Sequence, residues 1–253
     1  MIELINTYWW IILGFFAIAL LYSSVGFGGG SSYLALLALT PLLFTEIRSI
    51  SLLSNIVVVT GGIYIFARSG HFNWKKMIPL VIFSVPMAFL GGYLKISQSL
   101  FFILLGISLF IASLSMFMNF KSEIDSDQFY RKNLLRDGFF GGSIGLLSGM
   151  VGIGGGIFLA PLLHLTKWDS SKKIAATASF FILVNSISGL LGQITNPEFS
   201  INYELTFLLL ITVFIGGQIG SRIGAQLLSQ LFLKRATAVL IAYIAYTILK
   251  KYF

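Results

Sequence analysis

The sequence predicts an all-α polytopic membrane protein built of two inverted repeats, and three observations lead to this fold class. Hydrophobic residues make up 57% of the chain and charged residues 10%, against about 45–50% and about 25% in soluble domains. Apolar runs recur along the whole sequence, and backbone in hydrocarbon must satisfy its own hydrogen bonds. Two glycine runs interrupt the apolar pattern, once in each half, 126 positions apart.

Ten apolar segments are expected to form the helices. A helix needs about 20 residues, with a range of roughly 17–25, to cross a bilayer. Two segments, 31–44 and 157–165, are shorter than this, and each follows directly on a glycine run. We expect them to be short helices that either cross the membrane as thin spans or re-enter it. In chain order the segments are 8–25, 31–44, 47–66, 77–93, 100–118, 134–151, 157–165, 174–195, 205–221 and 236–249.

The glycine runs also mark an internal repeat. Residues 26–30 read Gly-Phe-Gly-Gly-Gly, and residues 152–156 read Gly-Ile-Gly-Gly-Gly. Paired interruptions at matching places in two halves are typical of transporters built from inverted repeats. We expect a first transmembrane repeat at 1–118 and a second at 134–253. The polar stretch 119–133 between them is expected to be a cytoplasmic linker.

Loop charges predict the orientation of the chain. Basic residues gather in the loops around Lys75, Lys132, Lys172 and Lys234, which the positive-inside rule assigns to the cytoplasm. The loop at 196–204 holds two acids and no base, so it is expected outside. Matching loops of the two halves therefore carry opposite bias, which predicts that the repeats are inverted. A multi-pass protein of the inner cell membrane with its N-terminus outside follows.

Glycines outside the two runs predict close helix packing. They recur every four residues at Gly141, Gly145 and Gly149, and the same spacing occurs at 216, 220 and 224. Such spacing places one smooth stripe along a helix, and small residues let the backbones of neighbouring helices approach.

The glycine runs themselves are the predicted substrate site. A helix that starts at Ser31 or Ile157 presents unpaired N–H groups and the positive end of its dipole to the preceding turn. Glycine is required there because the turn needs unusual φ values and a close approach of ligand to backbone. A small anion is the natural occupant. The predicted substrate-binding residues are Gly28, Gly29, Gly30, Ser31, Ser32 and Asn55 in the first half, and Gly154, Gly155, Gly156, Ile157, Thr177 and Asn185 in the second.

The hydroxyl groups in this set have an alternative role. Serine and threonine in membrane helices also serve as hydrogen-bonding contacts between packed helices. The buried amides of Asn55 and Asn185 are the stronger candidates, because an amide is harder to satisfy without a dedicated partner.

The residues around the glycine runs resemble the duplicated signature of the TauE/SafE sulfite exporter family. In the second half they read Gly-Met-Val-Gly-Ile-Gly-Gly-Gly at 149–156, followed by Pro161-Leu162-Leu163. In the first half they read Ser-Val-Gly-Phe-Gly-Gly-Gly at 24–30, with Ala35 at the position that corresponds to Pro161. The likeness covers essentially the whole chain, and it implies a membrane permease for sulfur-containing oxoanions and organosulfonates.

Titratable residues offer few further candidates. His164 lies eight residues after the second glycine run and is a candidate for carrying a coupling proton; its alternative role is a cap at the end of its helix. The four acids nearest the apolar segments, Glu46, Asp137, Asp169 and Glu204, lie near segment ends, and the chain has no cysteine. We expect no catalytic cluster, no metal site and no cofactor, and therefore no enzyme. The net charge of +8 is explained by the loops, so no nucleic-acid partner is expected.

These observations predict a secondary transporter that moves a small sulfur-containing anion by alternating access. The alternative is an anion channel that uses the same two helix ends. The expected partners are the anion and the lipid bilayer, and a homo-oligomer stays open. The sequence leaves open the direction of transport and the coupling ion, which could be a proton, sodium or none.

Overall fold

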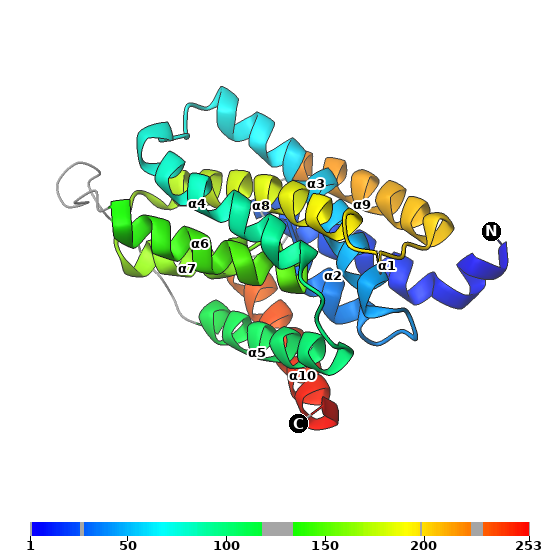
Figure 1. The fold of residues 1–253 in the computed structure, drawn as a ribbon. Coiled ribbons are helices and arrows are strands. Elements are labelled where there is room, and N and C mark those ends of the chain that lie inside the picture. Colours follow the sequence, from blue (N-terminus) through cyan, green and yellow to red (C-terminus); the bar gives the residue numbers. More distant parts are fainter. Residues whose placement is uncertain (1, 26–27, 118–133, 198, 224–229, 253) are drawn as a thin grey trace.

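The computed structural model describes residues 2–25, 28–117, 134–197, 199–223 and 230–252. This part of the chain contains ten helices and no strand, so the all-helical class is confirmed (Figure 1). The predicted linker 119–133, the start of the first glycine run at 26–27 and Gly224 lie outside the described residues. The helices are α1 Ile2–Val25, α2 Gly30–Leu37, α3 Phe44–Arg68, α4 Trp74–Tyr93, α5 Gln98–Phe117, α6 Leu134–Val151, α7 Gly156–Leu165, α8 Ser171–Ile194, α9 Tyr203–Ile223 and α10 Gln230–Tyr252.

The two short helices are found after the glycine runs, with one difference in length. The predicted segment 31–44 is helical only to Leu37, because Pro41 removes an N–H donor and restricts Thr40 before it. The chain turns there, and α3 starts at Phe44 rather than at residue 47. The carboxylate of Glu46 accepts a hydrogen bond from the backbone N–H of Leu43 at 3.3 Å and so satisfies a free amide at the start of α3.

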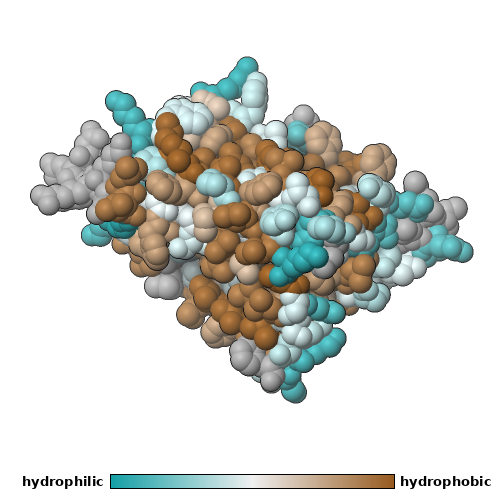
Figure 2. All heavy atoms as spheres, viewed as in Figure 1, coloured by the Kyte–Doolittle hydropathy of each residue, from teal (hydrophilic) through white to brown (hydrophobic). Residues whose placement is uncertain are grey.

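Six of the described helices are long and apolar enough to cross a membrane: α1, α3, α4, α5, α8 and α9. Large apolar side chains such as Leu13, Ile82 and Phe207 are at least 60% exposed. Hydrophobic residues cover much of the visible face of the molecule, and hydrophilic residues gather toward its margins (Figure 2). A soluble monomer rarely exposes apolar patches of this extent, so the surface is that of a protein surrounded by lipid.

The helices sort into two bundles that mix the two halves of the sequence. In the first bundle α1 packs along α9, and α3 contacts both α9 and α2. In the second bundle α4 packs along α6 and α8, and α7 packs on α8. A separate pair, α5 and α10, lies beside both bundles: α10 contacts α2, and α5 contacts α6 and α7 (Figure 1). Each half therefore places its fourth helix, α4 or α9, in the bundle of the other half.

The described residues form two buried apolar clusters, and the larger one extends from the first bundle to Val151 of α6 and Phe158 of α7. The larger cluster includes Phe15 of α1, Tyr33 of α2 and Leu209 of α9. The smaller cluster includes Leu80 of α4 and Phe181 of α8, and it gathers residues of α4, α6, α7 and α8. The helix pairing α1 with α9 in one bundle matches α6 with α4 in the other, as two equivalent repeats require. That the repeats are inverted across a membrane stays a prediction.

The predicted glycine stripes lie in the two main helix contacts. A Cβ added to Gly141, Gly145 or Gly149 of α6 would collide with a backbone carbonyl oxygen of α4. In the same way, Gly216 and Gly220 of α9 lie against carbonyl oxygens of α1. The prediction of close packing is thus confirmed for the described glycines.

Replacing Gly145 by leucine is expected to destabilise the second bundle. The new side chain would meet the backbone of Ser84, which cannot move without shifting α4. Overpacking of this kind costs about 1–3 kcal/mol, and a backbone obstacle favours the upper end. The measurement is thermal unfolding of the purified protein in detergent. The matched control is Gly61→Leu, because nothing lies within 4 Å of a Cβ at Gly61; equal stability of the two variants would contradict the prediction.

Candidate functional site

The two glycine turns have the backbone conformation that the sequence predicts. Gly29 caps α2 with φ 80° and ψ 7°, and Gly155 caps α7 with φ 81° and ψ −15°. Gly154, directly before it, has φ 82°. These left-handed values are strained for any residue with a Cβ, so glycine is required at all three positions. The equivalent residues of the two halves, Gly29 and Gly155, are thus both left-handed N-caps of a short helix.

A serine of α3 connects the two turns. The hydroxyl oxygen of Ser51 lies 3.1 Å from the carbonyl oxygen of Gly30 and 2.9 Å from that of Gly152, so its proton can serve either one. One helical turn further along α3, the Asn55 side-chain amide donates to the carbonyl oxygen of Ile153 at 3.0 Å. A Cβ built on Gly30 would come within 2.6 Å of that same Ile153 oxygen. The two turns therefore touch, although they are far apart in the sequence.

The first backbone amides of each short helix have no acceptor within their own helix. In α2 the N–H groups of Ser32 and Tyr33 donate to the carbonyl oxygen of Gly29. The N–H groups of Gly30 and Ser31 come too early in the helix to find an acceptor within it.

The start of α7 repeats this arrangement. The N–H groups of Phe158 and Leu159 donate to the carbonyl oxygen of Gly155, which leaves Gly156 and Ile157 without an acceptor within the helix. Both short helices therefore begin in the same way, and anion binding by their first amides stays a prediction.

Asn55 and Ser186 are the polar side chains closest to the second turn. A Cβ on Gly154 would lie 2.8 Å from the Asn55 amide nitrogen and 2.9 Å from the Ser186 hydroxyl oxygen. A Cβ on Gly28, in the first turn, would lie 2.6 Å from the Asn55 amide oxygen. That amide oxygen and the Ser186 hydroxyl are buried and have no hydrogen-bond partner. Asn55 therefore stands between the turns with capacity to bind something more.

The other predicted site residues are less closely involved. Asn185 donates to the carbonyl oxygen of Phe181 in its own helix at 2.9 Å. Ser32 shares a hydrogen bond with the Tyr22 hydroxyl at 2.9 Å. Thr177 is buried with an unpartnered hydroxyl, but no described contact joins it to a turn. His164 lies in the last turn of α7, at the far end from Gly156. Ser31 is buried at the start of α2.

The described residues of both turns lie close against side chains of α3 and α8. A Cβ added to Gly28 would come within 3.2 Å of the Ile182 side chain of α8, and a Cβ added to Gly154 would come within 2.9 Å of it. Asn55 of α3 also lies against both turns, as described above. The described part of the contact between the turns is therefore tightly packed in this conformation.

Three residues of this region were not singled out as site residues from the sequence. Ser51 and Asn55 are four residues apart on α3, and this spacing on one helix face was an available signal. Ser186 was recognised only as one hydroxyl among several. Ile182 carries no chemical signal, because an apolar residue in an apolar helix is expected everywhere.

A buried ion-pair cluster lies at the start of α4. The Asp169 carboxylate accepts hydrogen bonds from Lys76 at 3.0 Å, from Asn73 at 3.3 Å and from the backbone N–H of Ser170 at 2.9 Å. Lys173 of α8 lies 3.4 Å away. Burial by itself raises the pKa of the Asp169 carboxyl, but the hydrogen bonds from Lys76 and Ser170 and the two lysine charges together hold that pKa below its usual value. This cluster fastens α4 of the first half to the second bundle.

Comparison with known proteins identifies relatives among membrane transporters. The family description "Sulfite exporter TauE/SafE" matches residues 10–248. A "probable membrane transporter protein" of Sinorhizobium fredii is 31% identical over 231 residues, which cover 90% of this chain and 93% of that protein. A protein of the same description from Methanocaldococcus jannaschii is 30% identical over 146 residues, covering 55% of this chain and 53% of the relative. No solved structure matches the chain.

Replacing Asp169 by asparagine is expected to lower stability at neutral pH and to remove part of the acid sensitivity. Hydrogen bonds to a charged group contribute about 1.5–3 kcal/mol, so the free energy of unfolding falls by roughly that amount. The lowered pKa stabilises the fold above the unfolded value of about 3.9, and this contribution is lost as pH falls through the folded pKa.

The measurement for Asp169→Asn is thermal unfolding at pH 7 and at steps down to about pH 3. Glu3→Gln, at an exposed acid of α1, is the control. If Asp169→Asn and the unmodified protein lost stability in parallel on acidification, the role of this carboxylate would be wrong.

Proposed function

The chain belongs to the TauE/SafE sulfite exporter family, and we propose that it is a secondary transporter of a small sulfur-containing anion such as sulfite or an organosulfonate. The anion binds between the two glycine turns, where both short helices begin. It reaches this place alternately from the two sides of the membrane. The observation that carries the proposal is the contact of the two turns across Ser51 and Asn55.

The chemistry of the turns suits an oxoanion. Each helix start contributes about 0.3–1 kcal/mol when exposed and up to ~2 kcal/mol when partly buried. Each hydrogen bond to the charged group adds about 1.5–3 kcal/mol. Two helix starts and one side-chain amide supply these favourable contributions to anion binding without a cation in the site. An anion held only by neutral donors is also released readily, as a transport cycle requires.

The arrangement of the helices suggests which parts move. Since α4 and α9 are exchanged between the halves, the two sequence repeats cannot rock as separate bodies. The moving units are instead the first bundle of α1, α2, α3 and α9 and the second bundle of α4, α6, α7 and α8. They meet along α3 and α8 and at the glycine turns. Rocking about this contact opens one end of the site while the other stays closed.

The tight packing at the turns favours a carrier over a channel. Asn55 and Ile182 lie close against Gly28 and Gly154, so the described part of the site is tightly packed in this conformation. A channel needs a continuous path in its open state, whereas a carrier passes through an occluded state. A counterflow assay distinguishes the carrier from the channel.

Gly154→Ala is expected to reduce transport by about tenfold or more while the protein still folds, because a loss of about 1.4 kcal/mol in substrate binding corresponds to tenfold. The added methyl group would press on Asn55, Ile182 and Ser186 at the site. The measurement is uptake of labelled sulfite into proteoliposomes. The matched control is Gly70→Ala, which has φ 65° and therefore similar backbone strain, but nothing within 4 Å of its Cβ. Full transport by a folded Gly154→Ala variant would remove the glycine-turn site.

Counterflow is expected in proteoliposomes loaded with unlabelled sulfite. A carrier exchanges labelled for unlabelled anion through the occluded state, so label accumulates transiently inside. The same assay with thiosulfate, sulfate, sulfoacetate and taurine as internal anions ranks the substrates. Passive equilibration of label without any overshoot would show a channel instead.

A further inference from the structure

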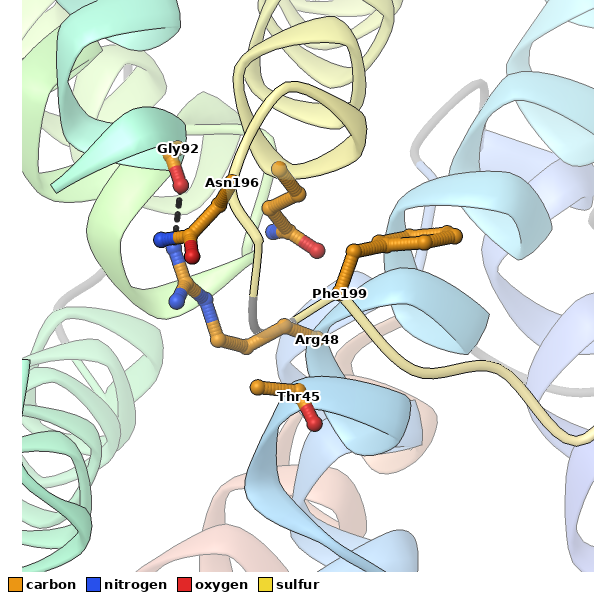
Figure 3. A pocket seen from close by; sticks show the side chains of 6 residues that line it. Thr45, Arg48, Gly92, Asn196 and Phe199 are labelled. Carbon is orange, nitrogen blue, oxygen red and sulfur yellow. Dashed lines mark hydrogen bonds between the residues drawn. The ribbon is translucent and has the colours of Figure 1, made fainter. Parts of the chain in front are cut away.

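A second candidate site lies between the bundles, at the end of the molecule where α4 and α6 finish. The pocket is lined by Thr45 and Arg48 of α3, by Gly92 of α4, and by Gln193, Asn196 and Phe199 of α8 and the loop after it. Figure 3 shows Arg48 reaching across to Gly92, with Asn196 and Phe199 beside it. The predicted topology places this end of the molecule on the outer side of the membrane. The pocket is narrow, with space for little more than a water-sized group.

Arg48 is a buried cation that is satisfied by backbone carbonyls. Its side chain is 3% exposed. One guanidinium nitrogen, Nη2, donates to the carbonyl oxygen of Gly149 at 3.0 Å and to those of Gly91 and Gly92 at 3.3 Å. These carbonyls lie in the last turns of α6 and α4, where helices have unpaired acceptors and the negative end of the dipole. Capping of two helix ends is therefore one role of this arginine.

Capping does not use the whole guanidinium group. The Arg48 Nε is buried and has no hydrogen-bond partner. Among the ion pairs of the described residues, the carboxylates of Asp137 and Asp169 pair with other cations and not with Arg48. A buried charge without an opposite charge is costly, and carbonyl dipoles balance it only in part.

A second unpaired donor belongs to Gln193, which also lines the pocket. The Gln193 side-chain oxygen accepts a hydrogen bond from the Ser49 hydroxyl at 2.9 Å. The Ser49 hydroxyl has one proton, and the carbonyl oxygen of Thr45 competes for it at 2.9 Å. With the amide oxygen toward Ser49, the Gln193 amide nitrogen is buried without a partner. Gln193 is itself only 4% exposed. Two N–H donors, one of them on a cation, thus lack acceptors in one enclosed place, which is the pattern that an anion completes.

The pocket adjoins the glycine turns. A Cβ on Gly152, in the second glycine run, would lie 3.1 Å from the backbone of Arg48. Ser51, which touches both turns, follows Arg48 by three residues and so lies on the same face of α3. An anion bound beside Arg48 is therefore one helical turn of α3 away from the contact between the turns.

We propose that Arg48 and Gln193 form a binding site for a small oxoanion, separate from the glycine turns. Its ligand accepts hydrogen bonds from the Arg48 Nε and the Gln193 amide nitrogen, and it enters when the first and second bundles separate. This assignment rests on the proposed function. The transported anion would then bind first at this site, on the outer side of the membrane. The rocking that separates the bundles also frees Arg48 from its carbonyls on α4 and α6.

The decisive variant is Gln193→Glu. Its carboxylate supplies Arg48 with a permanent opposite charge, so the variant is expected to fold and to be at least as stable as the unmodified protein without added anion. The probe is sodium sulfite, titrated at constant ionic strength while thermal unfolding is followed, since a ligand of the folded state raises its stability. In the Gly154→Ala background, which disables the glycine turns, sulfite still stabilises the protein. Adding Gln193→Glu to that background weakens the sulfite response about tenfold or more.

A second variant separates capping from anion binding. Arg48→Lys keeps the charge near the carbonyls but lacks the Nε donor, so it is expected to fold and to bind sulfite about tenfold more weakly. Arg136→Lys, at a partly exposed arginine of α6, is the matched control and leaves the response unchanged. An undiminished sulfite response in Gln193→Glu overturns the Arg48 site. Loss of the response in Gly154→Ala alone also overturns it, because all binding would then belong to the glycine turns.

The transport assay keeps the two proposals distinct. Gln193→Glu raises the external sulfite concentration for half-maximal uptake and leaves the maximal rate close to normal. If Gln193→Glu transports with unchanged concentration dependence while Gly154→Ala is inactive, the glycine-turn function stands and the outer site is wrong. If both variants transport normally, both proposals fail.

Discussion

The contact between the two glycine turns is the constraint on which the rest of the molecule depends. Ser51 can hydrogen-bond to a carbonyl of either turn, and Asn55 binds the backbone at Ile153. The bonds to Gly152 and Ile153 satisfy carbonyl groups of a turn that lies between α6 and α7 and outside both helices. Because the turns also need left-handed backbone, glycine is fixed at Gly29, Gly154 and Gly155. Irregular backbone is thus tolerated within the protein interior, where α3 closes it.

The polar contacts of α3 join the two bundles, whereas those at the start of α4 lie within the second bundle. Arg48, Ser51 and Asn55 all reach from α3 of the first bundle to backbone of the second. By contrast, the Asp169 cluster binds Lys76 and Lys173 within the second bundle. The contacts between the bundles include one cation, Arg48, bonded to carbonyl groups, and hydrogen bonds of uncharged side chains. Within the second bundle, a buried carboxylate pairs with two lysines.

Much of the candidate site could be predicted from the sequence because glycine acts locally. A run such as Gly-Ile-Gly-Gly-Gly predicts an unusual backbone conformation at its own residues, and the short apolar segment after it indicates that a short helix begins there. Asn55 was identified since a polar amide in an apolar segment needs a partner. Arg48 was not selected as a site residue, because its position near Glu46 at the start of an apolar run resembles the end of a span. Its burial depends on α4 and α6, which are far away in the sequence.

The sequence by itself determined the membrane class, the succession of helices, the two special turns and the family. These properties depend on composition and on spacing along one segment, which are local. Only the tertiary structure decided that α4 and α9 exchange bundles, that Ser51 and Ile182 stand at the turns, and that Arg48 caps two helices. A glycine stripe shows that some backbone comes close but not which one. The identity of the neighbour is set by the packing of all the helices together, since each apolar face can be buried against several others.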